Sequence, residues 1–285
     1  MILLSASWLA IFSCCYLFFE IFIFRYLGRV IPANLSYYFD FGARTLFQYS
    51  KSGATPENYI AIFGDSYAEG QGDWFFNSQF KRMPDTQATH LLHKSTHQDV
   101  VTFGVAGAGS IPAYLEYPAV SIQYIRSLWL YDMDDPDSIF LYFYEGNDIQ
   151  DNDYDYTETY LKKGYDPEKL DDIDYFEHFV SNEYIKVDET YIKSYNQNIS
   201  NNFITAHFLK FIISGIWDAI SNGTLGQRET LTPQILDNPI AALMNGEKVQ
   251  TPGLLQSPPL DKSKEEIQIA LTIFENSLKL VKKTY

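Results

Sequence analysis

Three short apolar runs, each followed by a polar turn that contains glycine, dominate the pattern of the first half of the chain. They cover residues 59–63, 99–103 and 138–144. Runs this short, rich in β-branched and aromatic residues and closed by turn residues, are typical of buried strands. The segments between them, 75–96 and 111–130, are predicted to be helices. This alternation predicts an α/β/α domain of three layers with a mainly parallel sheet.

A longer apolar run comes first. Residues 2–24 are almost unbroken in their hydrophobicity and long enough to cross a bilayer. No clear cleavage site follows, so we predict an uncleaved transmembrane signal anchor over residues 1–27. Glu20 is costly in lipid and is expected near the interface or against another helix. Arg25 and Arg29 follow the run, which by the positive-inside rule alone would put the rest of the chain in the cytoplasm.

The remaining pattern divides the chain further. Residues 28–57 are predicted to be a linker strap, and 264–283 an amphipathic helix. Residues 150–260 are too long for an ordinary connection, which indicates an insertion that shapes a substrate pocket and includes a helix at 203–220. The acidic stretch 148–174 alternates Asp as some calcium loops do. It lacks the glycine and closing glutamate of an EF-hand, so we expect a solvated loop.

Composition narrows the class of protein. A hydrophobic content of 46% is enough for a sizeable core, and a formal net charge of −15 argues against nucleic acid as a ligand. The only cysteines, Cys14 and Cys15, lie inside the first apolar run. No disulfide framework is therefore expected in the rest of the chain.

Candidate chemistry begins at Ser66, which follows Gly64 and Asp65 at the end of the first predicted strand. Sites of open α/β sheets lie at the carboxyl ends of the strands. The N–H groups at the start of a following helix favour developing negative charge, as a nucleophilic serine requires. The alternative is that Ser66 is only a helix N-cap.

The other two turns carry complementary features. Gly104, Gly107 and Gly109 follow the second strand, and such a turn can expose a backbone N–H. An ordinary tight turn would use the same residues, whereas a dinucleotide-binding fingerprint fits less well because the order of the glycines is wrong. Asn147 follows the third strand and carries an amide that can donate to an oxyanion, although Asn-Asp is also common turn chemistry.

Together these turns resemble the SGNH (GDSL-like) hydrolase family over roughly residues 58–150. Three stretches carry the resemblance: Gly64-Asp65-Ser66, Gly104-Val105-Ala106-Gly107 and Glu145-Gly146-Asn147-Asp148. The last departs from the usual Gly-x-Asn-Asp by one place in the position of the glycine. The resemblance implies a flavodoxin-like fold with Ser66 as nucleophile. It also implies an oxyanion hole made by the N–H groups of Ser66 and Gly107 and by the amide of Asn147, without any metal or organic cofactor.

The function implied by this resemblance is hydrolysis of an ester, with a small-molecule or glycan ester, for example an acetyl ester, as substrate. It also implies an extracytoplasmic domain, held to the membrane by the N-terminal helix. Two alternatives stay open: O-acyl transfer to or from a cell-surface polysaccharide, and a catalytically inactive module that binds glycan.

The base is the missing part. The family's Asp-x-x-His motif is absent, because none of the five histidines has an aspartate three residues before it. His178, with Asp174 one helical turn earlier, is the in-chain alternative. We expect residues 58–285 to be a hydrolase domain cut before the segment that carries the motif.

Overall fold

The structure is a computed structural model of the 285-residue chain. It describes residues 2–18, 20, 44–46, 48, 50–70, 88–129, 131–186, 209, 213, 217, 221 and 263–285. Of the predicted helix at 203–220 only residues 209, 213 and 217 are described, and these three are helical. Most of the predicted insertion after residue 186 lies outside the described residues.

A parallel three-stranded sheet forms the centre of the described part of the chain. Its strands are β1 (Ile60–Phe63), β2 (Val100–Thr102) and β3 (Ser138–Leu141), in the spatial order β2-β1-β3. Both neighbours of β1 are parallel to it. The predicted α/β class is therefore confirmed, and each strand is shorter than its apolar run because the flanking residues enter turns.

The three strands differ in burial. Every residue of β1 and β2 is buried, whereas β3 alternates between exposed and half-buried positions, with Phe140 48% exposed. A strand in the middle of a parallel sheet is covered on both faces, which explains the continuous apolar run of β1.

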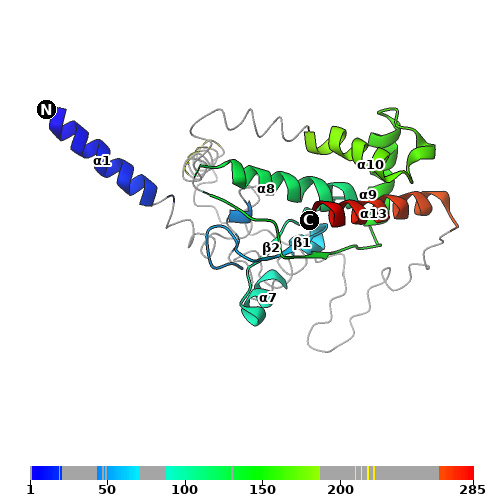
Figure 1. Ribbon diagram of the computed structural model, residues 1–285, viewed down its shortest axis with the longest axis horizontal. Helices are drawn as coiled ribbons and strands as arrows, with labels where there is room; N and C mark the ends of the chain where they lie inside the picture. Colours follow the sequence, from blue (N-terminus) through cyan, green and yellow to red (C-terminus); the bar gives the residue numbers. More distant parts are fainter. Residues whose placement is uncertain are drawn as a thin grey trace.

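Helices lie on both sides of this sheet (Figure 1). On one side is α7 (Ala88–Thr96), which contacts β2. On the other are α8 (Tyr117–Ser127), entered through the π-helical segment η2 (Pro112–Glu116), and α13 (Glu265–Thr284). Pro112 stands at the first position of its helix, where its missing N–H costs no hydrogen bond.

The acidic stretch predicted to be a solvated loop is instead helical, and that prediction is wrong. Its elements are α9 (Asp148–Tyr154), η3 (Asp155–Leu161), η4 (Pro167–Lys169) and α10 (Ile173–Val180), followed by η5 (Ser181–Ile185). Ile149, Tyr156 and Tyr160 recur at helical spacing and are buried, so their apolar face outweighs the low helix propensity of the aspartates between them.

The predicted C-terminal amphipathic helix is confirmed as α13. Its buried face, which includes Ile267, Ala270, Ile273 and Leu280, packs against α9, η2 and α10. At its end the ring of Tyr285 lies 5.7 Å from the ring of Phe63 in β1. The last helix therefore covers the sheet and the acidic helices together.

Part of the predicted linker strap is bound to the sheet. The Gln48 side chain donates to the carbonyl of Thr102 at 2.7 Å and accepts from its N–H at 2.9 Å. Ser50 pairs with Val100 in the same way, through its hydroxyl at 2.6 Å and its carbonyl at 2.8 Å. These bonds occupy backbone groups of β2 that an exposed sheet edge would leave unpaired.

The N-terminal apolar run forms α1 (Ile2–Phe18), which extends away from the sheet in Figure 1 (blue). Its large side chains, including Trp8, Phe12 and Phe18, are exposed. In the part of the chain that the structure describes, no helix combines the length and hydrophobicity needed to cross a membrane.

Candidate functional site

Ser66 opens α5 (Ser66–Glu69), directly after the turn that ends β1. Asp65 is the N-cap residue, and its carboxylate accepts the N–H of Tyr67 at 2.9 Å. The alternative in which Ser66 is the cap is therefore wrong. The Ser66 hydroxyl, half-buried, lies 3.4 Å from the other oxygen of Asp65, to which it donates.

The glycine turn after β2 lies directly on this helix. A Cβ built on Gly104 would come within 2.2 Å of the backbone nitrogen of Glu69, so only glycine fits there. The N–H of Val105 donates to the carbonyl of Gly64 at 3.1 Å. Gly107 has a φ of 71° in the left-handed region, and a Cβ there would meet open space. Its glycine is therefore required by backbone conformation.

Glu69 joins the two turns, a role that the sequence analysis missed. Its side chain is buried, accepts the N–H of Ala106 at 3.2 Å and forms an ion pair with Arg44 at 3.3 Å. Its only sequence signal is an acidic residue at the end of a short apolar helix, which indicates neither partner.

Asn147 lies in the turn after β3. Its N–H donates to the carbonyl of Tyr144 at 3.2 Å, and its side-chain amide donates to Asp151 at 3.0 Å. The side chain is half-buried and caps no backbone group of α9, which begins at the next residue. One amide hydrogen is directed to Asp151, and the amide carries a second donor.

Contacts between the first and third turns bring them together. The ring of Tyr67, next to Ser66, lies 4.7 Å from the ring of Tyr144, measured between centroids. The N–H of Tyr142 donates to the carbonyl of Phe63 at 2.9 Å. The turns that carry Ser66, Gly107 and Asn147 thus adjoin at the carboxyl end of the sheet. The two strands that come after β1 in the sequence, β2 and β3, lie on opposite sides of it. Open α/β sheets bind ligands at such a point, outside the carboxyl ends of the strands.

A buried carboxyl, Asp148, lies behind these turns. One oxygen accepts the N–H of Tyr144 at 2.7 Å, while the other is buried without a hydrogen bond in the structure. Burial raises the pKa of Asp148 to about 7; the bond from Tyr144 lowers it, and the nearby Asp65 and Asp151 raise it further. This group can therefore hold a proton near neutral pH. A turn aspartate gives no sequence sign of such burial.

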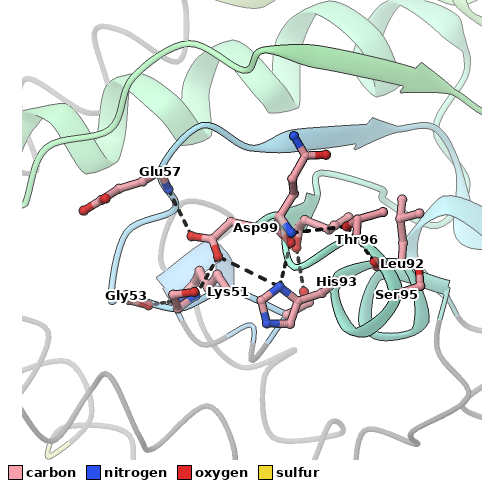
Figure 2. A network of polar contacts seen from close by, with 12 residues as sticks. Lys51, Gly53, Glu57, Leu92, His93, Ser95, Thr96 and Asp99 are labelled. Atoms are coloured by element: carbon pink, nitrogen blue, oxygen red, sulfur yellow. Dashed lines mark hydrogen bonds and ion pairs between the residues drawn. The ribbon is translucent and has the colours of Figure 1, made fainter.

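The described histidines lie elsewhere. His93 in α7 approaches Asp99 (Figure 2). Asp99 precedes β2 and so stands at the opposite end of the sheet from Ser66. His178 is exposed on α10, and its ring lies 2.8 Å from the amide of Asn182. His207 is outside the described residues. Within the described part of the chain, no hydrogen bond joins a histidine to Ser66.

The described residues also bear on whether the site could hold a metal ion. Among the described residues, no group of three or more histidine, cysteine, aspartate or glutamate side chains is arranged to hold a metal ion.

In comparisons with family models, curated proteins and solved structures, no match to the chain was found. Functional inference therefore depends on the geometry of the three turns.

Proposed function

We propose that this chain is a serine ester hydrolase of the SGNH type, with a flavodoxin-like sheet. One observation carries the proposal: three turns that follow three parallel strands in chain order adjoin at one end of the sheet. They hold a serine, a glycine in the left-handed conformation and an asparagine, namely Ser66, Gly107 and Asn147. These are the groups that acyl transfer requires as nucleophile and oxyanion donors.

The reaction would proceed through an acyl-serine. The Ser66 oxygen attacks the ester carbonyl carbon while its proton passes to a base. The carbonyl oxygen becomes an oxyanion that accepts from the N–H groups of Ser66 and Gly107 and from the second amide hydrogen of Asn147. The C–O bond to the alcohol then breaks, the alcohol leaves with a proton, and water hydrolyses the acyl-serine.

The base is a separate requirement, because a serine hydroxyl without one is a weak nucleophile. No described histidine is hydrogen-bonded to Ser66, so the proposal requires that a residue outside the described part of the chain supplies the base. We expect His178 not to fill this role, since it is exposed on α10 and bonded to Asn182. His178→Ala should accordingly leave turnover unchanged.

The test is a panel of acetyl and longer-chain esters, given to the full chain and to its Ser66→Ala variant. Ser95→Ala, which removes an exposed hydroxyl from α7, is the matched control. Turnover should be lost only in Ser66→Ala. Equal turnover by all three proteins would refute the nucleophile. Adding a glycan acceptor separates hydrolysis, which releases free acid, from O-acyl transfer.

The binding-module alternative is favoured by one observation: in the described part of the chain, the only hydrogen bond of the Ser66 hydroxyl is to Asp65. Half-exposed Tyr67 beside it could stack on a sugar ring. If this alternative holds, Ser66→Ala retains glycan affinity and Tyr67→Ala loses it, and no ester is hydrolysed by any variant.

We further propose that the N-terminal helix anchors the chain in a membrane, with the catalytic domain outside the cytoplasm. The support is the exposed apolar surface of α1 together with the apolar sequence that continues to Phe24. Flotation of the full chain with phospholipid vesicles tests the anchor. Replacing Trp8 and Phe12 together by Asp should abolish flotation, and unchanged flotation would refute the proposal.

A further inference from the structure

Asn152 is a fully buried amide on α9, five residues after Asn147. Its carbonyl oxygen accepts the N–H of Ser110 at 2.6 Å. Its nitrogen donates to the Ser110 hydroxyl at 2.9 Å and to the carbonyl of Ala270 at 3.1 Å. The side chain thus joins three segments: the glycine turn after β2, the helix after β3, and α13.

The glycine turn packs directly on the same helix. A Cβ built on Gly109 would lie 2.9 Å from the Asn152 side-chain oxygen and 2.8 Å from a carboxylate oxygen of Asp155. The carbonyl of Gly109 accepts the N–H of Ala113 at the start of the next helix. Two residues after Gly107, the chain is therefore fixed by helices on both sides.

The other proposed oxyanion donor, the amide of Asn147, lies next to α9. Asn147 precedes the first residue of the helix, and its amide is held by Asp151, one residue before Asn152. A single helical turn thus contacts both the asparagine turn and the glycine turn. Its orientation sets how far the N–H of Gly107 lies from the Asn147 amide.

We propose that Asn152 is a positioning residue that holds the Gly107 N–H and the Asn147 amide in one geometry. The expected fall in kcat rests on the proposed function. The anchoring of the glycine turn by Asn152 does not depend on that function. An oxyanion hole acts through donors fixed before the reaction begins. Loosening one donor relative to the other should therefore lower kcat and leave KM nearly unchanged.

Asn152→Leu removes all three bonds at nearly constant volume. Asn276→Leu is the matched control, because Asn276 is also a buried amide and donates to the carbonyl of Leu170 at 2.8 Å, from α13. Both variants should lose stability. Only Asn152→Leu should lower kcat, by about tenfold to a hundredfold, and only it should speed amide hydrogen exchange in residues 104–110.

Asn152→Asp provides a second variant if Asn152→Leu does not fold. It keeps an acceptor for the Ser110 N–H and loses the donor to Ala270, so its kcat should fall less. Equal kcat and equal exchange in the Asn152 and Asn276 variants would overturn the inference. Activity that does not depend on Ser66 would refute the proposed function instead. In that case faster exchange in residues 104–110 of the Asn152 variant alone still supports the anchor, and unchanged exchange overturns it.

Discussion

Buried charged residues lie at both ends of the sheet, but their hydrogen bonds are more complete at the amino end than at the carboxyl end. At the amino end, both oxygens of the buried Asp99 accept backbone N–H groups, from Ser52 at 2.7 Å and from Glu57 at 3.1 Å (Figure 2). The buried ammonium of Lys51 donates to three carbonyls, those of Leu46, Gly53 and Ala54. The bonds of Asp99 hold the strap at the start of β2, and those of Lys51 join parts of the strap to one another. Charged groups bonded this fully have little capacity left for a ligand.

At the carboxyl end, the polar groups are less fully paired. One oxygen of the buried Asp148 has no hydrogen bond, and Gly107 borders open space. Asn147 has one described side-chain bond although its amide has two donors. A buried charged residue therefore marks structure when its hydrogen bonds are complete. Incompletely paired groups that gather beside a half-exposed hydroxyl are candidates for function.

The largest expected effect is at the carboxyl end. Asn147→Ala should lower kcat about 10²–10³-fold with little change in KM, because the oxyanion accepts its amide most strongly in the transition state. The thermal midpoint should barely move, since the side chain is half-buried. Steady-state kinetics and a melting curve measure both. A change in KM alone would mean that Asn147 only shapes the turn.

Lys51→Met tests the amino end. Leaving buried carbonyls without their donor should cost about 3 kcal/mol of folding free energy. Below the lowered midpoint, kcat should be that of the parent protein. Urea unfolding measures the loss, with Lys94→Met on the exposed face of α7 as control. A fall in kcat without a loss of stability would show that the two ends are not separate in role.

The pH dependence of stability should reveal Asp148. Its pKa is raised to about 7, so the folded state holds this proton more tightly than the unfolded state. The contribution to stability is complete below about pH 4 and is lost progressively as the pH rises through 7. Asp148→Asn should flatten this decline, whereas Asp171→Asn, at an exposed position, should not. Parallel curves for the parent protein and Asp148→Asn would contradict the buried carboxyl.

Asp155 shares this behaviour, because burial raises its pKa to about 7 as well, against the bond from Tyr184 that lowers it. The decline that remains in Asp148→Asn should therefore diminish further when Asp155→Asn is added. If the remaining decline of stability with pH is unchanged by Asp155→Asn, that decline comes from another titrating group.

Among the substitutions expected to lower stability, Gly107→Ala should have the smallest effect, about 1 kcal/mol, since alanine is strained in the left-handed region. Gly164 is a close match, with a φ of 81° and open space around its Cβ position. Gly164→Ala should lose as much stability without losing kcat. Because alanine keeps the backbone N–H, kcat of Gly107→Ala should fall only as far as the strained turn displaces that N–H. Equal kcat in the two variants would show that the strain does not displace it.

Much of the fold and of the candidate site could be predicted from the sequence, because β1, β2 and the turns after them produce local sequence patterns. Strand burial follows from apolar runs, and the α13 helix follows from its periodicity. The acidic helices were missed because aspartate disfavours helix locally, whereas the burial of Tyr156 and Tyr160 depends on tertiary packing. The roles of Glu69 and Asn152 depend on partners 25 or more residues away, which a single sequence does not indicate.

We propose that Ser66 is a nucleophile whose oxyanion donors lie in the turns of Gly107 and Asn147. Covalent labelling with a fluorophosphonate, followed by peptide mapping, tests it most directly, because the probe bonds to an activated serine and leaves a stable adduct. We expect one adduct, on Ser66, that forms more slowly in Asn147→Ala and is absent after heat denaturation. Labelling at another serine, or labelling of the denatured chain at the same rate, would contradict it.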